Sequence, residues 1–308
     1  MVRLPDSFLN LRAIRTLRVH EGVLQTISLD PLANSSNLTV LMLGLNRVKQ
    51  LIVSDNPDLV LPVKDFSLAD NQLEYIDGAF FNPLKYLIYL SLEGNRIQRI
   101  GGPIVSFPRL TTCHLGNNQM TYLNVSNWRA PKLQNVFLDN NNMTQLPIGL
   151  GRLPNLTGLQ MSNNKLSIID LRRLEGYPQL QTIDVSSNLL RAVRVSQQGK
   201  VTLPLVELVN LAQNQISQID FTRWNMPMLR SLTLAFNRLE RLPDLFKLFP
   251  KLGRTVAFRN PFRCNSLRQL ESYLAENRLT VDTNAFGQSC ITNSSFKVST
   301  GRVICCIE

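Results

Sequence analysis

Ten asparagines recur along this chain at nearly constant intervals, and this regularity constrains the fold more than any other feature. They lie at positions 46, 71, 95, 118, 141, 164, 188, 214, 237 and 260, so neighbouring ones are 23 to 26 residues apart. Apolar residues recur around them, as Leu90, Leu92 and Ile97 do around Asn95. Self-similarity at such a period is typical of stacked structural repeats, in which each unit contacts only its neighbours.

The residue types within one copy fit the pattern L-x-x-L-x-L-x-x-N-x-L of a leucine-rich repeat. Alternating apolar positions predict a short strand with inward side chains that fill the core. The asparagine then turns inward, where its amide can pair backbone groups left open at the strand end. We therefore predict an α/β solenoid, a leucine-rich-repeat horseshoe. A parallel sheet would line its concave face, and irregular or short helical segments its convex face.

Both ends of such an array need caps, because terminal repeats would otherwise expose apolar surface. We expect an N-terminal cap and first degenerate repeat over 1–36, in which Gly22 replaces the asparagine. Regular repeats follow over 37–262, and a cysteine-containing C-terminal cap closes the array over 263–308. Within this cap, leucines at i, i+3 and i+7 predict one amphipathic helix over 266–274.

The five cysteines divide into one in the repeats and four in the C-terminal cap. Cys113 occupies a strand position that is leucine in most copies, which indicates a buried small hydrophobe. Spacings of 26, 15 and 1 between Cys264, Cys290, Cys305 and Cys306 do not resemble zinc-binding pairs, so we expect a disulfide-bonded cap. A Cys264–Cys290 bridge is our first pairing hypothesis. The vicinal pair then either splits between two partners or leaves one thiol for another chain, because closing on itself would strain it.

Sequons and cysteines together predict a secreted, extracellular glycoprotein. The acceptor asparagines of the six N-x-S/T sequons are Asn34, Asn37, Asn124, Asn142, Asn155 and Asn293. No apolar run approaches the length of a membrane span. No signal peptide is visible at the N-terminus, and the removal of one before Met1 is the alternative.

The C-terminal cap carries a more specific resemblance. Asn260-Pro261-Phe262-Arg263-Cys264 followed by an amphipathic helix resembles the cap of extracellular leucine-rich-repeat proteins, although Ser266 stands where the usual second cysteine would lie. With Val281-Asp282 and the vicinal cysteine pair, the cap is similar to that of the mosquito leucine-rich immune proteins, which include the Anopheles Plasmodium-responsive group. Only this cap, about 45 residues, is specific to that family.

That resemblance implies a role in innate immunity. The family consists of haemolymph proteins that form disulfide-linked dimers with a related leucine-rich-repeat chain. They stabilise a complement-like thioester-containing protein on parasite or microbial surfaces. Long members continue into a coiled coil, and this chain has no heptads after its last cysteines, so the resemblance gives less support to a dimer.

Two sets of outward positions are candidate binding surfaces. A polar column with one aromatic residue lies on the predicted concave face, which favours a protein partner. We assign to it His114, Phe137, Asp139, Gln160, Asp184 and Asn210. A basic flank follows the ladder asparagines and comprises Arg47, Arg96, Arg99, Lys165, Arg191, Arg238 and Arg241. An uneventful solvated surface is the simpler interpretation of either set.

Charge makes a polyanion the alternative ligand. The formal net charge is +11, and residues 221–263 contain nine basic against two acidic side chains. A receptor ectodomain or matrix-type protein that binds a polyanion through the basic flank is therefore our second hypothesis, and an intracellular repeat regulator with free thiols is the third. We expect no enzyme, cofactor or metal, because no phosphate loop, zinc motif or dinucleotide fingerprint occurs.

Overall fold

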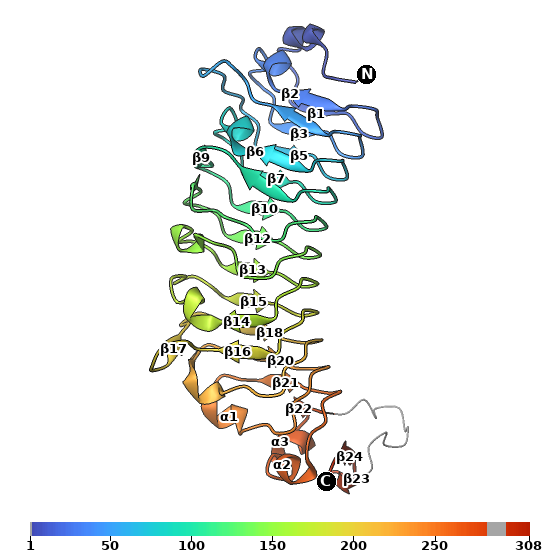
Figure 1. The fold of residues 1–308 in the computed structure, drawn as a ribbon, viewed down its shortest axis with the longest axis vertical. Helices are drawn as coiled ribbons and strands as arrows, with labels where there is room; N and C mark the ends of the chain where they lie inside the picture. The colour runs from blue at the N-terminus through green and yellow to red at the C-terminus, as the bar shows by residue number, and fades with distance from the viewer. Residues whose placement is uncertain (1, 282–293) are drawn as a thin grey trace. The chain divides into compact units, whose positions relative to one another are not determined.

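The computed structural model describes residues 2–281 and 294–308 (Figure 1). The chain folds into two compact units, Met1–Met161 and Ser162–Glu308. We call them the N-terminal unit and the C-terminal unit and describe each by itself. The sequon at Asn293 and the residues Cys290 and Asp282 lie outside the described residues.

The described part of the N-terminal unit contains seven parallel main-sheet strands, one from each repeat (Figure 1). They are β1 (Thr16–Arg18), β3 (Val40–Met42), β5 (Asp65–Ser67), β7 (Tyr89–Ser91), β10 (Thr112–His114), β12 (Asn135–Phe137) and β13 (Gly158–Gln160). Equivalent repeat positions pair across neighbouring strands, as Cys113 does with Val136. The predicted parallel sheet is therefore confirmed, and side chains at one repeat position form columns across it.

The other side of the N-terminal unit is less regular. Short parallel pairs join β2 (Thr26–Ser28) with β4 (Gln50–Ile52), β6 (Tyr75–Asp77) with β8 (Arg99–Gly101), and β9 (Val105–Ser106) with β11 (Trp128–Arg129). Single turns of 3-10 helix cover Asp6–Asn10, Asp30–Leu32, Gly78–Phe81 and Leu150–Arg152. The short helical segments were predicted. The secondary strand pairs were not, because their residues lack a pattern distinct from a loop.

Buried asparagine amides connect successive repeats. The Nδ2 of Asn95 donates to the carbonyls of Leu68, Leu92 and Glu93 at 2.9, 3.0 and 3.2 Å. Its Oδ1 accepts from the backbone N–H of Leu73 in the preceding repeat at 3.1 Å. Asn46, Asn71, Asn118 and Asn141 bond in the same way. The predicted asparagine ladder is thus confirmed.

The first, degenerate repeat ends this ladder with glycine for a steric reason. A Cβ on Gly22 would lie 2.5 Å from Oδ1 of Asn46, which bonds the backbone N–H of Leu24. The missing side chain therefore leaves room for the asparagine of the following repeat.

The C-terminal unit continues the same repeat. Its main-sheet strands are β15 (Thr182–Asp184), β18 (Leu208–Asn210), β20 (Ser231–Thr233), β21 (Arg254–Val256) and β22 (Leu279–Thr280). Secondary pairs join β14 (Ile168–Asp170) with β16 (Ala192–Arg194) and β17 (Val201–Thr202) with β19 (Trp224–Asn225). Turns of 3-10 helix cover Leu171–Leu174 and Phe221–Arg223, and α1 spans Leu245–Leu248. No helix of the described chain is long and apolar enough to span a bilayer.

Two arginines hold the longest repeat, in which Asn188 and Asn214 are 26 residues apart. Arg172 donates to the carbonyls of Ser196, Gln198 and Lys200 from one side of the extra loop. Arg223 donates to carbonyls of the same loop, including that of Val195 at 2.8 Å. The added residues are therefore tied to the repeats on either side.

The C-terminal cap extends the sheet and covers its last repeat. Strand β22 pairs with β21, and the antiparallel strands β23 (Ser294–Lys297) and β24 (Val303–Cys306) form a separate hairpin (Figure 1). The single helix predicted over 266–274 is wrong, because Gln269 and Leu270 separate α2 (Cys264–Arg268) from α3 (Glu271–Ala275), and Leu270 has φ −114° and ψ 17°. The three leucines of the predicted apolar face, Leu267, Leu270 and Leu274, are nonetheless buried.

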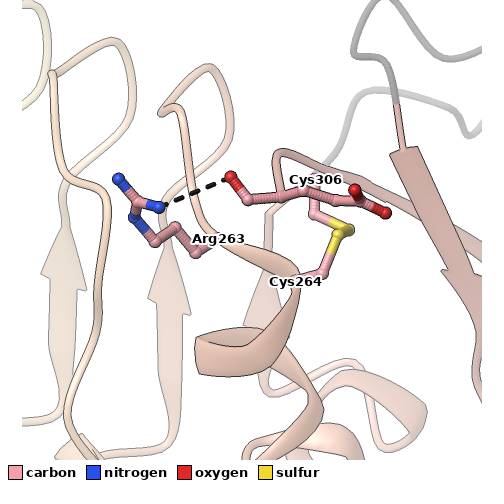
Figure 2. Close-up of a disulfide and its surroundings, with 4 residues drawn as sticks. Arg263, Cys264 and Cys306 are labelled. Atoms are coloured by element: carbon pink, nitrogen blue, oxygen red, sulfur yellow. Dashed lines mark hydrogen bonds between the residues drawn. A yellow bond between two sulfur atoms is a disulfide. The ribbon is translucent and has the colours of Figure 1, made fainter.

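Disulfide pairing in the cap differs from the first hypothesis. Cys264 bonds Cys306 and not Cys290, with a Cα–Cα distance of 5.0 Å (Figure 2). Strand β24 makes this pairing by bringing Cys306 to the start of α2, where Cys264 donates its N–H to the carbonyl of Ile307. Cys305 is disulfide-bonded as well, so the vicinal pair splits between two partners. Neither cysteine of the vicinal pair is therefore a free thiol in this structure.

We predict that Asn95→Ala lowers the free energy of unfolding by at least about 2 kcal/mol, because it leaves buried backbone groups without partners. Urea unfolding followed by circular dichroism measures the change. The matched control is Gln98→Ala, an exposed side chain three residues away, which should change stability by no more than about 0.5 kcal/mol. Equal stabilities of the two variants would contradict the role of the ladder.

Candidate functional site

The exposed face of the main sheet carries the predicted concave-face residues. We call it the open face and define it by the positions two, four and six residues before each ladder asparagine. Buried and partly exposed residues alternate along the strands, as in β12, where Val136 is buried between Asn135 and Phe137. His114, Phe137, Asp139 and Gln160 lie partly exposed on the open face of the N-terminal unit. Asp184 and Asn210 lie on that of the C-terminal unit.

A stack of three rings occupies the open face of the N-terminal unit. The rings of His114 and Phe137 are nearly parallel, with centroids 4.2 Å apart and an interplanar angle of 8°. The ring of Tyr89 lies 5.2 Å from that of His114 on the other side, tilted by 46°. Parallel strands lie about 4.8 Å apart, so His114 and Phe137, which are register partners in one column, are brought to stacking distance. Tyr89 pairs with Thr112 and therefore reaches His114 diagonally from the neighbouring column. We call Tyr89, His114 and Phe137 the ring stack.

Two carboxylates lie beside the ring stack. Burial against neighbouring groups lowers the pKa of His114 below its ordinary value of 6.5, while the negative charges of Glu93 and Asp139 act to raise it. Desolvation is the larger effect, so the neutral imidazole is favoured at neutral pH. The amide of Asn117 donates to Oε1 of Glu93 at 2.9 Å, which helps to hold that carboxylate in place. The site combines an apolar ring surface with negative charge.

The polar residues of the C-terminal unit bond mainly to one another. Asp184 accepts from the amide of Asn210 at 3.0 Å and from the N–H and hydroxyl of Ser186 at 2.9 and 2.7 Å. Two rings lie farther along, Phe236 and Phe258, with centroids 5.2 Å apart, and Phe236 is 44% exposed. Because the Asp184 cluster is satisfied internally, the ring stack is the stronger candidate for contact with a ligand.

All seven predicted basic-flank residues are exposed. They do not form a continuous patch, because the repeats between Arg47 and Arg96 and between Lys165 and Arg238 carry uncharged residues at the same position. The Arg99 guanidinium lies 5.1 Å from the ring centre of Tyr75 and covers that ring.

Arginines gather more closely in the C-terminal unit, where an open groove runs between the last repeats and the cap. Arg238, Arg241, Arg263 and Arg268 line it. Arg263 is paired with Glu240 at 2.8 Å and donates to the carbonyl of Glu308 at 3.4 Å (Figure 2). The other three arginines have no ion pair within the residues that the structure describes. We call this surface the arginine groove.

The described sequons lie away from the open face. Asn34, Asn37, Asn124 and Asn155 are exposed and Asn142 is partly exposed. Each lies outside the three open-face positions of its repeat, so glycans at these asparagines would be attached beside or behind the strands. The open face of the N-terminal unit thus carries no sequon of its own.

Sequence reasoning missed Tyr89 and Glu93 as members of the site. Tyr89 lies six residues before its ladder asparagine, a column that was not considered, although alternation along a strand places it on the same face as Ser91. Glu93 and Asp139 occupy the same repeat position two repeats apart, and this equivalence was the available signal for the second carboxylate. By contrast, the prediction for Cys113 is confirmed, since it is buried and desolvation raises the pKa of its thiol to about 12.

Comparison with known proteins supports the fold. Residues 131–190 match a family model described as leucine rich repeat. No curated protein matches the sequence. Together with the parallel sheet and the asparagine ladder, this match confirms the predicted leucine-rich-repeat fold with its disulfide near the C-terminus.

Several solved structures share this fold at low sequence identity. The leucine-rich repeat domain of Anopheles APL1 is 19% identical, with a TM-score of 0.66 over 100% of this chain and 88% of that one. That of Anopheles LRIM1 is 16% identical, with a TM-score of 0.63 over 96% and 83%. A chain from a complex of Latrophilin 3, Unc5D and FLRT2 is 20% identical, with a TM-score of 0.70 over 90% and 84%.

We predict that Phe137→Ala moves the pKa of His114 upward, toward 6.5 or above, because it removes part of the desolvation and keeps both carboxylates. In the wild-type protein the folded-state pKa of His114 lies below the value of 6.5 in the unfolded chain, so the unfolded chain binds the proton first as the pH falls. The contribution of neutral His114 to stability is therefore full above pH 6.5 and decreases as the pH falls toward the folded-state pKa. NMR titration of the imidazole is practical, since the chain has only two histidines. Gln160→Ala, two strands from His114, is the control. A pKa of His114 that is the same in both variants would exclude the ring stack as the cause.

Proposed function

We propose that this leucine-rich-repeat protein is a secreted binding protein of innate immunity and that it binds a protein partner through the open face of its N-terminal unit. The observation that carries the proposal is the ring stack of Tyr89, His114 and Phe137. Partly exposed aromatic side chains within a polar surface are the usual composition of a binding hot spot. The surrounding side chains, among them Gln160 and Asn135, supply the polar rim.

Burial and glycan placement support the open face as the contact surface. The inward positions of the same strands form the core and are unavailable, as Val136 and Cys113 illustrate. All described sequons lie outside the open face. Glycosylation would therefore shield the other surfaces and keep this one accessible.

Disulfide bonding and fold similarity support the extracellular and immune parts of the proposal. Stable disulfides favour an oxidising compartment, and the cap contains the Cys264–Cys306 bridge. LRIM1 and APL1C, two leucine-rich-repeat proteins, form a complex with each other. We propose a related leucine-rich-repeat chain and a complement-like thioester-containing protein as candidate partners in haemolymph.

We expect Phe137→Ala to reduce the capture of a partner by at least about tenfold, since truncation of a hot-spot residue typically costs about 2 kcal/mol or more. The full chain, immobilised through one engineered tag, is incubated with haemolymph, and the retained proteins are quantified by mass spectrometry. Thr233→Ala, in the same column of the C-terminal unit, is the matched control. Equal retention by wild type and Phe137→Ala would refute binding through the ring stack.

A second candidate function is the binding of a polyanion, as in a receptor ectodomain or matrix-type protein. The arginine groove favours it, because Arg238 and Arg241 belong to the basic flank and meet Arg263 and Arg268 of the cap there. Clustered guanidinium groups are well suited to sulfate or phosphate groups.

For this second function we predict that the double variant Arg238→Gln/Arg241→Gln elutes from heparin at a clearly lower salt concentration than the wild type. The double variant Arg12→Gln/Arg15→Gln removes the same charge from exposed positions of the N-terminal unit and should shift the elution much less. If both double variants lower the salt concentration of elution by the same amount, the effect is one of general charge. That result would refute a site in the groove.

A further inference from the structure

The position just before each ladder asparagine has a left-handed backbone conformation, with φ between 51° and 67°. Glycine and small polar residues adopt this conformation at the lowest cost, and a bulky apolar residue there is strained. Phe236, at φ 55°, is the one aromatic residue among the ten such positions of the described chain. The ten residues are Leu45, Asp70, Gly94, Asn117, Asn140, Asn163, Ser187, Gln213, Phe236 and Arg259.

Burial does not offset the strain at Phe236. The residue is 44% exposed, and its ring contacts that of Phe258, with centroids 5.2 Å apart and an interplanar angle of 76°. Phe258 is itself partly exposed, and its carbonyl accepts from the N–H of Phe236 at 2.9 Å. A strained residue that keeps an apolar ring in solvent indicates a role other than folding. We call Phe236 and Phe258 the phenylalanine pair.

Positive charge lies beside the phenylalanine pair. In β18, β20 and β21, the open-face positions and the left-handed position after each strand hold two arginines, Arg254 and Arg259, and no carboxylate. Both arginines are exposed and have no ion pair with any residue that the structure describes. Glu207, one residue outside these positions, is paired with Arg230 at 3.4 Å. This part of the open face therefore lacks carboxylates of its own to balance the two guanidinium groups.

Rings and guanidinium groups belong to one small surface. Arg259 directly follows Phe258, and it holds in its repeat the position that Phe236 holds in the preceding one. Neighbouring parallel strands are about 4.8 Å apart, so one bound segment can contact both repeats. Carboxylates complement the guanidinium groups by charge-assisted hydrogen bonds, and an aromatic side chain complements the rings.

We propose that the phenylalanine pair, with Arg254 and Arg259, is a second protein-binding surface and that it binds an acidic segment carrying an aromatic side chain. Aromatic and arginine residues together are the usual constituents of binding hot spots. The edge-to-face contact fixes the two rings in advance, so they lose little conformational freedom on binding. The surface lies in the C-terminal unit and goes beyond the proposed function, because it does not involve the ring stack.

The test uses three labelled peptides and the full chain, with binding measured by fluorescence anisotropy at physiological salt. The first peptide has two phenylalanines among six glutamates. The second has serine in place of phenylalanine, and the third has glutamine in place of glutamate. We expect the first to bind at least about tenfold more tightly than either of the others, since each control removes one half of the complementarity.

The decisive variant is Phe236→Asn, because asparagine occupies the same left-handed position in three other repeats. It removes the ring and relieves the strain, so it should shift the melting temperature by no more than about 4 °C. The affinity for the first peptide should nevertheless fall at least about tenfold. Leu45→Asn makes the same kind of change at an exposed position of the N-terminal unit and should leave that affinity unchanged.

A charge variant tests the two arginines. Arg254→Gln/Arg259→Gln should weaken binding of the first peptide by about three- to tenfold, the usual range for two exposed ion pairs. Glutamine is compatible with the left-handed backbone, as Gln213 shows at the equivalent position. The control double variant Arg12→Gln/Arg15→Gln removes the same charge from the N-terminal unit and should weaken binding much less.

Three results would overturn the proposal. They are equal affinities for the first and second peptides, binding of the first peptide unaffected by Phe236→Asn, and its displacement by a short single-stranded oligothymidine, whose bases also stack on rings. If one of these occurs while Phe137→Ala still abolishes partner capture, the proposed function stands and only the second surface fails. If Phe137→Ala leaves partner capture unchanged while the peptide results are as expected, the second surface stands without the ring stack.

Discussion

The hydrogen bonds of the ladder asparagines are the interaction on which the rest of the structure depends. Each amide satisfies carbonyls at the end of its own strand and of the preceding one, and accepts an N–H from the preceding repeat. Unpaired polar groups in a buried position would cost more than a typical hydrogen bond contributes. One asparagine per repeat therefore fixes the register of neighbouring strands, and the columns of the sheet follow from that register.

The columns explain why a binding surface can arise without any change to the scaffold. Inward positions must be apolar and close-packed, whereas outward positions face solvent and are free to vary. Wherever two neighbouring repeats place rings at the same outward position, as His114 and Phe137 do, strand spacing brings them to stacking distance. The ring stack and the two carboxylates beside it are thus local choices on a shared frame.

The C-terminal cap follows a different physical rule. Its helices bury leucines against the last repeat, and its covalent bond is determined by which strand returns to the start of α2. That return is made by β24, which brings Cys306 next to Cys264 although 42 residues separate them in sequence. Cysteine spacing gives no information on such a long-range approach, so the first pairing hypothesis, Cys264–Cys290, was wrong. The helix expected over 266–274 was likewise divided at Leu270, because periodicity of leucines indicates a buried side and not backbone continuity.

The sequence by itself determined the repeat, its strands, the inward asparagines, the burial of Cys113 and the outward column that contains His114 and Phe137. These depend on residue type at a fixed local spacing, and local spacing is visible in one dimension. Only the tertiary structure decided that Tyr89 joins the ring stack, that Asp184 is satisfied by Asn210 and Ser186, and that Arg238 and Arg241 meet the cap arginines in a groove. These depend on side-chain direction and on the approach of residues that lie one or more repeats apart in sequence, which no periodic pattern encodes.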